Sequence, residues 1–450
     1  MAKMLENAAC ITPQDIGTYA GNYENNPVAR AATLALSRHS LTDISYDAIK
    51  AGGMNYIFSN EIQTMPVTNQ MSSGRCWIFA GLNLLREIVG KKYNLEEFEL
   101  SQSYVAFWDK FEKINFFLES VSGMLDADAD DRTLVWLLQC GINDGGQWDM
   151  LVNVIKKYGL VPKDAMPETF ATSNTGNMNG FINKKLREYS AGMRKIRAGG
   201  GSESDLRIYK KDALDEMFTF LCMNMGKPPV QFDFEAVDKD KKFICDRGMS
   251  PVSFYNKYIG SEIDDYVSVI NAPTPGKPYD RTYTVRYLGN VTEGARIIYL
   301  NVRLPDFKAL ARKQMLAGEL IWFGSDCGRF GDRKTGVWDN GLYDYERVTG
   351  IGANLTKGEA LDYRESAMNH AMLFTAANFL DDNTVNRWKI ENSWGDSHGK
   401  KGYFVCSDQW FDEFVYQLVI NKKYLSDKML EDLIQEPIEL NPWDPMGSLA

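Results

Sequence analysis

The sequence has few residues that could bind a metal ion. It contains only three histidines, and its seven cysteines are scattered, with no two in a C-x-x-C pair. Zinc sites need clustered Cys and His ligands at short spacings. We therefore expect no metal and no other cofactor. An odd number of scattered cysteines suits a reducing compartment, and we expect six of them to be buried thiols.

Long apolar runs and an excess of positive charge are also missing. No segment approaches the length of a membrane span, and residues 1–15 lack the continuous apolar stretch of a secretory signal. Fifty basic residues against sixty acidic ones give a net charge of −10. Such a protein repels nucleic acid and anionic membranes unless one face is locally basic. We expect a cytoplasmic protein of ordinary globular composition that binds neither membranes nor nucleic acid.

Cys76 lies at the predicted start of a long helix. Apolar residues recur at helical spacing after it, from Trp77 to Ile88, and Ser72, Ser73 and Gly74 suit a helix start. The unpaired N–H groups of a helix N-terminus carry partial positive charge and lower the pKa of a thiol. Cys76 is therefore a candidate nucleophile, although a lone cysteine in a helix is more often a packing residue.

The general base can be found by elimination among the three histidines. His39 lies in a polar N-terminal segment and His398 in a polar loop, so both are expected at the surface. His370 begins an apolar β-type run, and catalytic groups are common at strand ends. A lone histidine there is ordinarily a core residue, so the assignment depends on its partners.

Asn392 is the predicted partner of His370. It ends the strand-like run W-K-I-E and is followed by Ser393, Trp394 and Gly395. An amide oxygen can accept the proton on the far ring nitrogen of a histidine and so fix its tautomer. The indole of Trp394 is expected to shield that hydrogen bond from water. Six positions before Cys76, Gln70 is a candidate oxyanion donor together with the Cys76 backbone N–H.

These residues resemble those of the papain family of cysteine peptidases. The matching elements are Gln70 and the segments 73–77, 369–371 and 392–395. The sequence reads S-G-R-C-W where the family signature is C-G-[SA]-C-[WY], and His370 lies 294 positions after Cys76 rather than some 130–150. The resemblance therefore implies an α+β papain-like core, with a helical left domain, a β-barrel-like right domain and a large, mainly helical insertion.

The implied organisation has five parts along the chain. Residues 1–60 form an N-terminal arm, 61–169 the helical part with the nucleophile, and 170–310 the insertion. Residues 311–425 form the β part with His370 and Asn392, and 426–450 a C-terminal arm entering the cleft. From its prolines and lack of pattern, the segment 436–450 is expected to be an extended tail.

Segments 66–70, 142–150 and 443–450 further resemble the branch that contains bleomycin hydrolase and bacterial aminopeptidase C. This branch implies a homohexamer whose active sites face an inner cavity. Gly145 and Gly146 would hydrogen-bond the substrate backbone, because a glycine allows close approach without a Cβ. The carboxylate of Ala450 would meet the free α-amine of the peptide substrate.

The leading hypothesis is an intracellular cysteine aminopeptidase of broad specificity that acts through a thioester acyl-enzyme. The alternative within enzymes is a cysteine endopeptidase acting on oligopeptides. From another class, the chain could be a papain-like binding or scaffold protein that grips nucleic acid through the basic run 184–197. A scaffold has no need of Gln70, Cys76, His370 and Asn392 together, which favours the enzyme.

Overall fold

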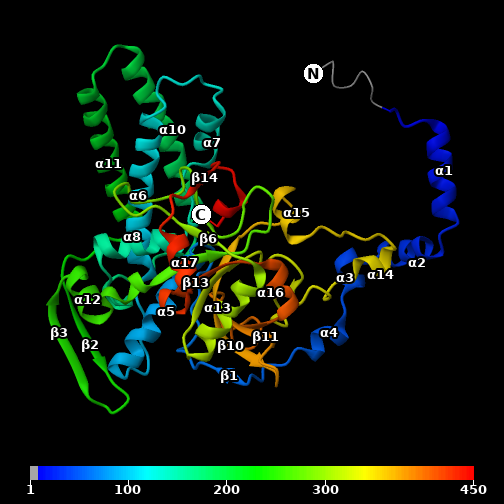
Figure 1. Ribbon diagram of the computed structural model, residues 1–450. Coiled ribbons are helices and arrows are strands. Elements are labelled where there is room, and N and C mark those ends of the chain that lie inside the picture. The colour runs from blue at the N-terminus through cyan, green and yellow to red at the C-terminus, as the bar shows by residue number, and fades with distance from the viewer. Residues whose placement is uncertain (1–8, 450) are drawn as a thin grey trace.

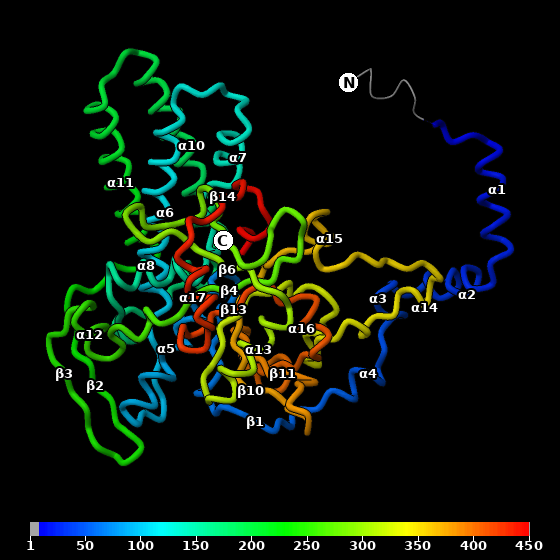
Figure 2. The backbone as a smooth tube through the Cα atoms, in the orientation of Figure 1, coloured from blue at the N-terminus to red at the C-terminus, as the bar shows by residue number. Residues whose placement is uncertain are grey.

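The computed structural model describes residues 9–449, and the first part of these lies away from the rest. Figures 1 and 2 show this N-terminal segment leaving the body as a separate arm. No residue of its first two helices is buried, and the arm meets the body near α14 (Tyr345–Thr349). Its elements are α1 (Pro13–Glu24), α2 (Pro27–Leu36), α3 (Leu41–Ser45), α4 (Ala48–Gly53) and β1 (Asn60–Glu61).

The next part is helical and is built around α5 (Cys76–Tyr93). This helix is buried along most of its length because it packs against two other helices, α6 (Gln102–Ser122) and α8 (Trp148–Tyr158), and against strand β10 (His370–Phe379). The predicted helix start at Cys76 is confirmed. The other helices of this part are α6 (Gln102–Ser122), α7 (Arg132–Cys140), α8 (Trp148–Tyr158) and α9 (Phe170–Ser173).

A long helical hairpin follows. It consists of α10 (Gly176–Ala198) and α11 (Glu203–Met225), and the glycines 199–201 form the turn between them, as predicted. Both helices pack on α6 and project beyond the body (Figure 1). A separate two-stranded sheet and a short helix come next, namely β2 (Phe232–Val237), β3 (Phe243–Met249) and α12 (Pro251–Tyr258).

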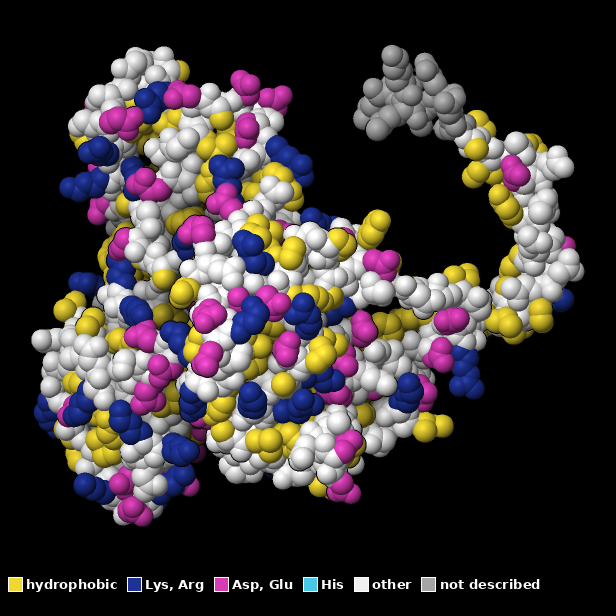
Figure 3. All heavy atoms as spheres, viewed as in Figure 1, with side chains coloured by type: hydrophobic (Ala, Val, Ile, Leu, Met, Phe, Trp, Pro, Cys, Tyr) yellow, Lys and Arg dark blue, Asp and Glu magenta, His cyan; other side chains and the backbone are white. Residues whose placement is uncertain are grey.

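The basic run 184–197 on α10 is engaged with the protein itself. Arg187 donates to the carbonyls of residues 138 and 139, and Arg194 donates to the Ala127 carbonyl. Lys185 and Arg197 pair with glutamates. Figure 3 shows basic and acidic side chains interspersed over the visible face rather than a single basic patch. Two of the cations of this run, Lys185 and Arg197, are thus paired with carboxylates, and two more are oriented by backbone carbonyls.

The strands form one large mixed sheet in the order β14-β5-β6-β4-β13-β7-β10-β11-β12-β9-β8, with β1 beside β10. Its two end strands, β14 and β8, do not pair, so the described strands form an open path rather than a closed barrel. The predicted α+β class is confirmed. The strands not yet given are β4 (Tyr266–Ile270), β5 (Arg281–Val285), β6 (Tyr299–Asn301), β7 (Ile321–Ser325), β8 (Gly331–Asp332), β9 (Val337–Trp338), β11 (Val385–Glu391), β12 (Tyr403–Ser407), β13 (Val415–Asn421) and β14 (Ile438–Leu440).

Short helices flank this sheet, and two large apolar cores result, besides a small cluster around Val337, Leu342 and Val405. One core lies between the helical part and the sheet and contains Trp77, Trp148 and Trp322. The other lies on the far side, where Trp388 and Trp410 pack. The flanking helices are α13 (Leu304–Leu316), α14 (Tyr345–Thr349), α15 (Lys357–Asp362), α16 (Asp408–Phe414) and α17 (Asp427–Leu433).

Three features differ from the sequence-based expectations. Strands β4, β5 and β6 lie within residues 170–310 yet join the large sheet, and the boundary at 310 falls inside α13. The tail contains a regular strand, because β14 pairs in parallel with β5. The expectation of six buried thiols is wrong. Apart from Cys76, only Cys406 is buried, although all seven thiols are free.

Candidate active site

Cys76 is the first residue of α5, at the junction between the helical part and the sheet. Its side chain is buried, and the backbone N–H of Ala371 points at its sulfur at 3.5 Å. Since Ala371 follows His370 on β10, this contact joins the helix that carries the nucleophile to the strand that carries the base. Cys76 and His370, which are 294 positions apart, line the same pocket, as the sequence predicted.

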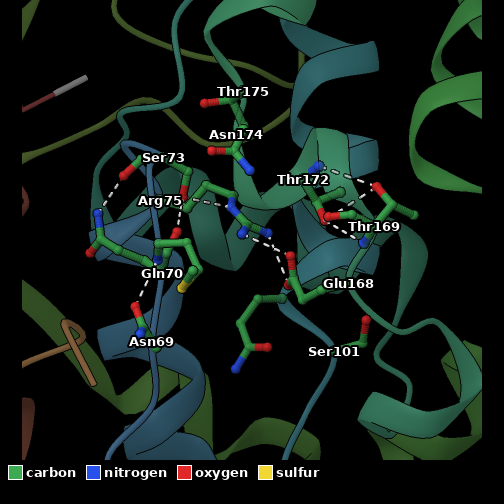
Figure 4. A network of polar contacts seen from close by, with 12 residues as sticks. Asn69, Gln70, Ser73, Arg75, Ser101, Glu168, Thr169, Thr172, Asn174 and Thr175 are labelled. Carbon is green, nitrogen blue, oxygen red and sulfur yellow. Dashed lines mark hydrogen bonds and ion pairs between the residues drawn. The ribbon is translucent and has the colours of Figure 1, made fainter. Parts of the chain in front are cut away.

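The turn before Cys76 is fixed by Arg75, whose side chain is almost completely buried. Its guanidinium makes a bidentate ion pair with Glu168 at 2.8 and 3.0 Å, and its Nε donates to the Ser73 hydroxyl. Figure 4 shows the guanidinium between these two partners, and the side chain also lies over the Phe79 ring. Bidentate pairs are geometrically specific, so Arg75 sets the direction in which α5 begins.

His370 and Asn392 form the predicted hydrogen bond. Nε2 of His370 lies 2.8 Å from Oδ1 of Asn392, and the same oxygen accepts the Ser393 N–H. An amide oxygen only accepts, so Nε2 carries the proton and Nδ1 is free to receive one from a thiol. The Trp394 ring stacks on the imidazole at 4.9 Å between centroids, which covers this hydrogen bond as expected.

Burial dominates the electrostatics of Cys76 and His370. It raises the pKa of the Cys76 thiol to about 11, despite the N–H groups of Ala371, Trp77 and Cys76, which lower it. It lowers the pKa of His370 to about 4, against the effect of the Asn392 hydrogen bond. The expected lowering of the thiol pKa is therefore outweighed by desolvation, which opposes a single charge on either group. Moving the proton from sulfur to imidazole creates two opposite charges together, and their attraction offsets part of that cost.

Gln70 is buried beside the nucleophile rather than exposed in a loop. Its Oε1 accepts the Ser393 hydroxyl at 2.6 Å, and its Nε2 donates to the Ser73 carbonyl. A carboxamide nitrogen has two hydrogens, so one remains for a second acceptor. Gln70 and Cys76 line the same pocket, which is where the oxyanion would form. The oxyanion role itself stays a prediction.

Gly145 and Gly146 form one wall of the cleft. The Gly146 N–H donates to the Leu449 carbonyl at 3.1 Å, so the C-terminal tail occupies the position expected for a substrate backbone. A Cβ on Gly146 would lie 2.5 Å from the Trp77 indole, so this position requires glycine. The wall is supported from behind by Lys113, whose ammonium donates to the Gly145 carbonyl.

The tail is held in the cleft by further contacts. Leu449 is buried, and the Ser448 hydroxyl donates to the Met368 carbonyl at 2.7 Å. Ala450, the predicted ligand of the substrate amine, lies outside the described residues. A pocket of about 370 Å³ remains open beside the tail, lined by Gln70, Gly74, Cys76, Asn143, Asp144, Gly145, Asn179, Asn369, His370, Ser448 and Leu449.

One buried charge network at the site was not predicted. Asp144 accepts from the Gly74 N–H, the Thr175 hydroxyl and Asn179, and it pairs with the buried Lys110. Desolvation raises the pKa of Asp144, but Lys110 and the hydrogen bonds from Thr175 and Asn179 together outweigh it and hold that pKa well below the usual range. The network ties the turn before Cys76 to the Gly145–Gly146 wall. Only the adjacent Gly-Gly pair could have drawn attention to Asp144 in the sequence.

The comparisons with known proteins agree with this geometry. The model of the Peptidase C1-like family matches residues 10–447. The chain belongs to this family. It is 42% identical over 440 residues to aminopeptidase C of Listeria innocua serovar 6a, covering 98% of this chain and 99% of that protein. It is 38% identical over 453 residues to rat (Rattus norvegicus) bleomycin hydrolase, covering 99% of this chain and 100% of that protein.

A solved structure is similarly close. The crystal structure of PepW from Lactobacillus rhamnosis superposes with a TM-score of 0.96 at 44% identity, covering 98% of this chain and 100% of that one. The chain is therefore a cysteine-type peptidase with the fold of this family, as the sequence predicted. Within residues 9–449, no helix combines the length and apolar character needed to cross a bilayer.

Proposed function

We propose that this protein is a cysteine aminopeptidase of broad specificity, which removes N-terminal residues from peptides through a thioester acyl-enzyme. The observation that carries the proposal is the hydrogen bond from the Gly146 N–H to the Leu449 carbonyl. The tail occupies one end of the cleft as a substrate backbone would, so a peptide can extend in only one direction from Cys76. The relatives named aminopeptidase C match over nearly their whole length, which supports the same activity.

Each catalytic residue has a definite task in the proposed reaction. His370 takes the proton of the Cys76 thiol at Nδ1, and the thiolate attacks the carbonyl carbon of the first peptide bond. The oxyanion meets the Cys76 N–H and the remaining hydrogen of the Gln70 amide. His370 then gives its proton to the leaving amine, and water, activated by the same imidazole, hydrolyses the thioester. Asn392 keeps the ring in the required tautomer throughout.

The end of the tail selects the free amine. The residue after Leu449 is Ala450, and we propose that its carboxylate pairs with the α-ammonium group of the substrate. An N-acetylated peptide has no ammonium group and would leave the tail carboxylate unpaired in a desolvated cleft. This is energetically costly, so such a peptide is rejected. Peptides longer than the space beside the tail extend toward the opposite end of the cleft.

The decisive experiment compares a free-amine peptide with its N-acetylated form. Full-length enzyme should cleave only the free-amine peptide, and a variant truncated after residue 447 should cleave both. Cys76→Ser, with folding checked by circular dichroism, should cleave neither. Equal cleavage of both peptides by the full-length enzyme contradicts the aminopeptidase proposal and favours an oligopeptide endopeptidase. Undiminished turnover by Cys76→Ser contradicts the nucleophile assignment.

We further propose a cytoplasmic homohexamer. Seven free thiols suit a reducing compartment. The N-terminal arm carries strongly exposed apolar side chains, such as Leu34 at 77% and Ile49 at 88%, which a neighbouring subunit would cover. Light scattering should give six times the chain mass of 51.0 kDa. A monomeric mass at micromolar concentration contradicts the assembly without affecting the catalytic proposal.

A further inference from the structure

A cationic side chain lies just beyond the aromatic cover of the catalytic histidine. The Trp394 ring stacks on His370, and the guanidinium carbon of Arg333 lies 4.3 Å from the centroid of the same ring. Such a cation–π contact orients the guanidinium and leaves its N–H groups available to a second partner. Arg333 stands in the turn between β8 and β9, so it comes from a different part of the sheet than His370.

The turn that carries Arg333 is well anchored. Its neighbour Asp332 accepts from the hydroxyls of Thr335 and Tyr46, and Trp338 on β9 is buried in the core behind Trp394. The position of Arg333 is thus fixed by the fold even though its side chain is exposed.

Arg333 has no carboxylate partner among residues 9–449. By contrast Arg329, four residues earlier in the chain, pairs with both Asp326 and Glu365. The charge of Arg333 nonetheless affects the pKa of His370. Burial is the main cause that lowers the pKa of His370, and Arg333 acts in the same direction. An oriented cation without an anion at the edge of an active site suggests that an anion arrives with the substrate.

The side of the cleft on which Arg333 lies follows from the chemistry. The tail, through Leu449 and Gly146, occupies the end where the amino-terminal side of the substrate is held. His370 must reach the leaving amine in order to protonate it. The leaving peptide therefore departs on the histidine side, past the Trp394 ring and toward Arg333.

We propose that Arg333 binds the C-terminal carboxylate of the leaving peptide and so favours short peptides with a free C-terminus. This inference rests on the proposed aminopeptidase function. The two centroid distances place the guanidinium at most about 9 Å from the imidazole, a span that an extended peptide covers in two to three residues. Tripeptides and tetrapeptides, whose leaving peptides have two or three residues, are thus the substrate class of this subsite. An acidic side chain near the cleaved bond presents the same chemical group.

The test uses full-length enzyme and peptides that all carry a free α-amine. Initial kcat/KM is measured for Ala-Ala-Ala and for Ala-Ala-Ala-amide, and the acid-to-amide ratio is taken for each variant. Wild type should prefer the acid by about fivefold, the upper range for a partly exposed ion pair. Arg333→Gln should bring the ratio close to one, and Arg333→Lys should retain most of it. Lys334→Gln removes an exposed positive charge from the next position and should leave the ratio and overall activity unchanged.

A second pair of substrates identifies the source of the carboxylate. Ala-Glu-Ala-amide and Ala-Gln-Ala-amide differ only in a side-chain charge, so a preference for the first that Arg333→Gln abolishes supports carboxylate binding by a side chain as well. The proposal is overturned if the wild type does not prefer Ala-Ala-Ala to its amide, or if that preference survives in Arg333→Gln. Because each ratio is internal to one variant, a general loss of activity does not alter it. Failure of the aminopeptidase function would appear separately, as cleavage of N-acetylated peptides.

Discussion

Replacing Arg86 by methionine should destabilise the protein in a manner that depends strongly on pH. Arg86 lies on α5 and forms an ion pair with Glu391 at 3.1 Å, and both side chains are almost fully buried. Glu391 is the residue directly before Asn392 in the sequence. The same Glu391 oxygen accepts from Asn83 at 2.9 Å. This pair joins the nucleophile helix to the end of β11, so its loss affects the site as well as the fold.

The sign of the effect follows from the pKa of Glu391. Burial raises it to about 7 from 4.5, against the opposing effect of Arg86. The folded protein therefore holds a proton between pH 4.5 and about 7 that the unfolded chain has lost, and stability falls as pH rises through this window. The ionisation of the buried Glu391 lowers the free energy of unfolding by about 3 kcal/mol, and this decrease is complete above pH 7. Without Arg86 the folded pKa is higher still, so the decrease in stability continues further into the alkaline range.

The magnitude can be stated at two pH values. At pH 8.5 Arg86→Met leaves Glu391 buried without its cation, which costs about 3–5 kcal/mol. At pH 5.5 Glu391 is neutral in both proteins, so only hydrogen bonds and packing are lost, at about 1–2 kcal/mol. The free energy of unfolding is measured by urea titration at a fixed protein concentration.

Two controls make this prediction sharp. The double variant Arg86→Met with Glu391→Gln removes the buried carboxylate, so most of the extra loss at pH 8.5 should disappear. What remains reflects Glu87, which also pairs with Arg86 at 3.3 Å. Arg207→Met replaces an exposed arginine on α11 and should change stability little at either pH. An equal loss for Arg86→Met at both pH values would refute the assignment of a buried, titrating carboxylate at Glu391.

Two further substitutions test the cleft directly. Asn392→Ala removes the acceptor of the His370 ring proton. It should lower kcat by about 10- to 100-fold with little change in KM, as is usual when a group that orients an essential ligand or base is lost. A change confined to KM contradicts the orienting role. Gly146→Ala places a Cβ against Trp77 and should lower kcat/KM on peptides by at least about tenfold, because a displacement of the substrate backbone by about 1 Å is sufficient for such a loss. A wild-type kcat/KM for this variant contradicts the close approach of the substrate backbone to Gly146.

The sequence predicted the central chemistry because that chemistry depends on residue types with few alternatives. Three histidines left one plausible base, and Cys76 stood at the head of a recognisable amphipathic helix. The strand that ends before Asn392 has a clear alternating pattern, and it is β11 in the structure. These features are local, so a single sequence suffices to find them.

The features that were missed depend on long-range pairing. The ion pair of Asp144 with Lys110 joins common residue types 34 positions apart, and nothing local marks either as buried. Strand β14 forms because β5 offers it an edge, about 150 positions earlier in the chain. The full exposure of Cys140 on α7 and the partial exposure of Cys222 on α11 and Cys245 on β3 follow from where these elements meet solvent, which the hydrophobicity of cysteine does not reveal.

The two ends of the cleft are built in different ways, which determines what each can select. The amino-terminal end is closed by the tail, whose Leu449 carbonyl satisfies the Gly146 N–H before any substrate arrives. In the proposed function a substrate fits beside this backbone, with only its first residue on the tail side of Cys76. The opposite end is bordered by Trp394 and the exposed Arg333, which in our proposal selects a carboxylate at a matching distance from the cleaved bond. Changes in the tail should thus alter where a peptide is cut, and changes at Arg333 should alter which leaving peptide is preferred. A variant carrying both changes should show the two effects independently, because they act on opposite sides of Cys76 and share no contact in the described residues.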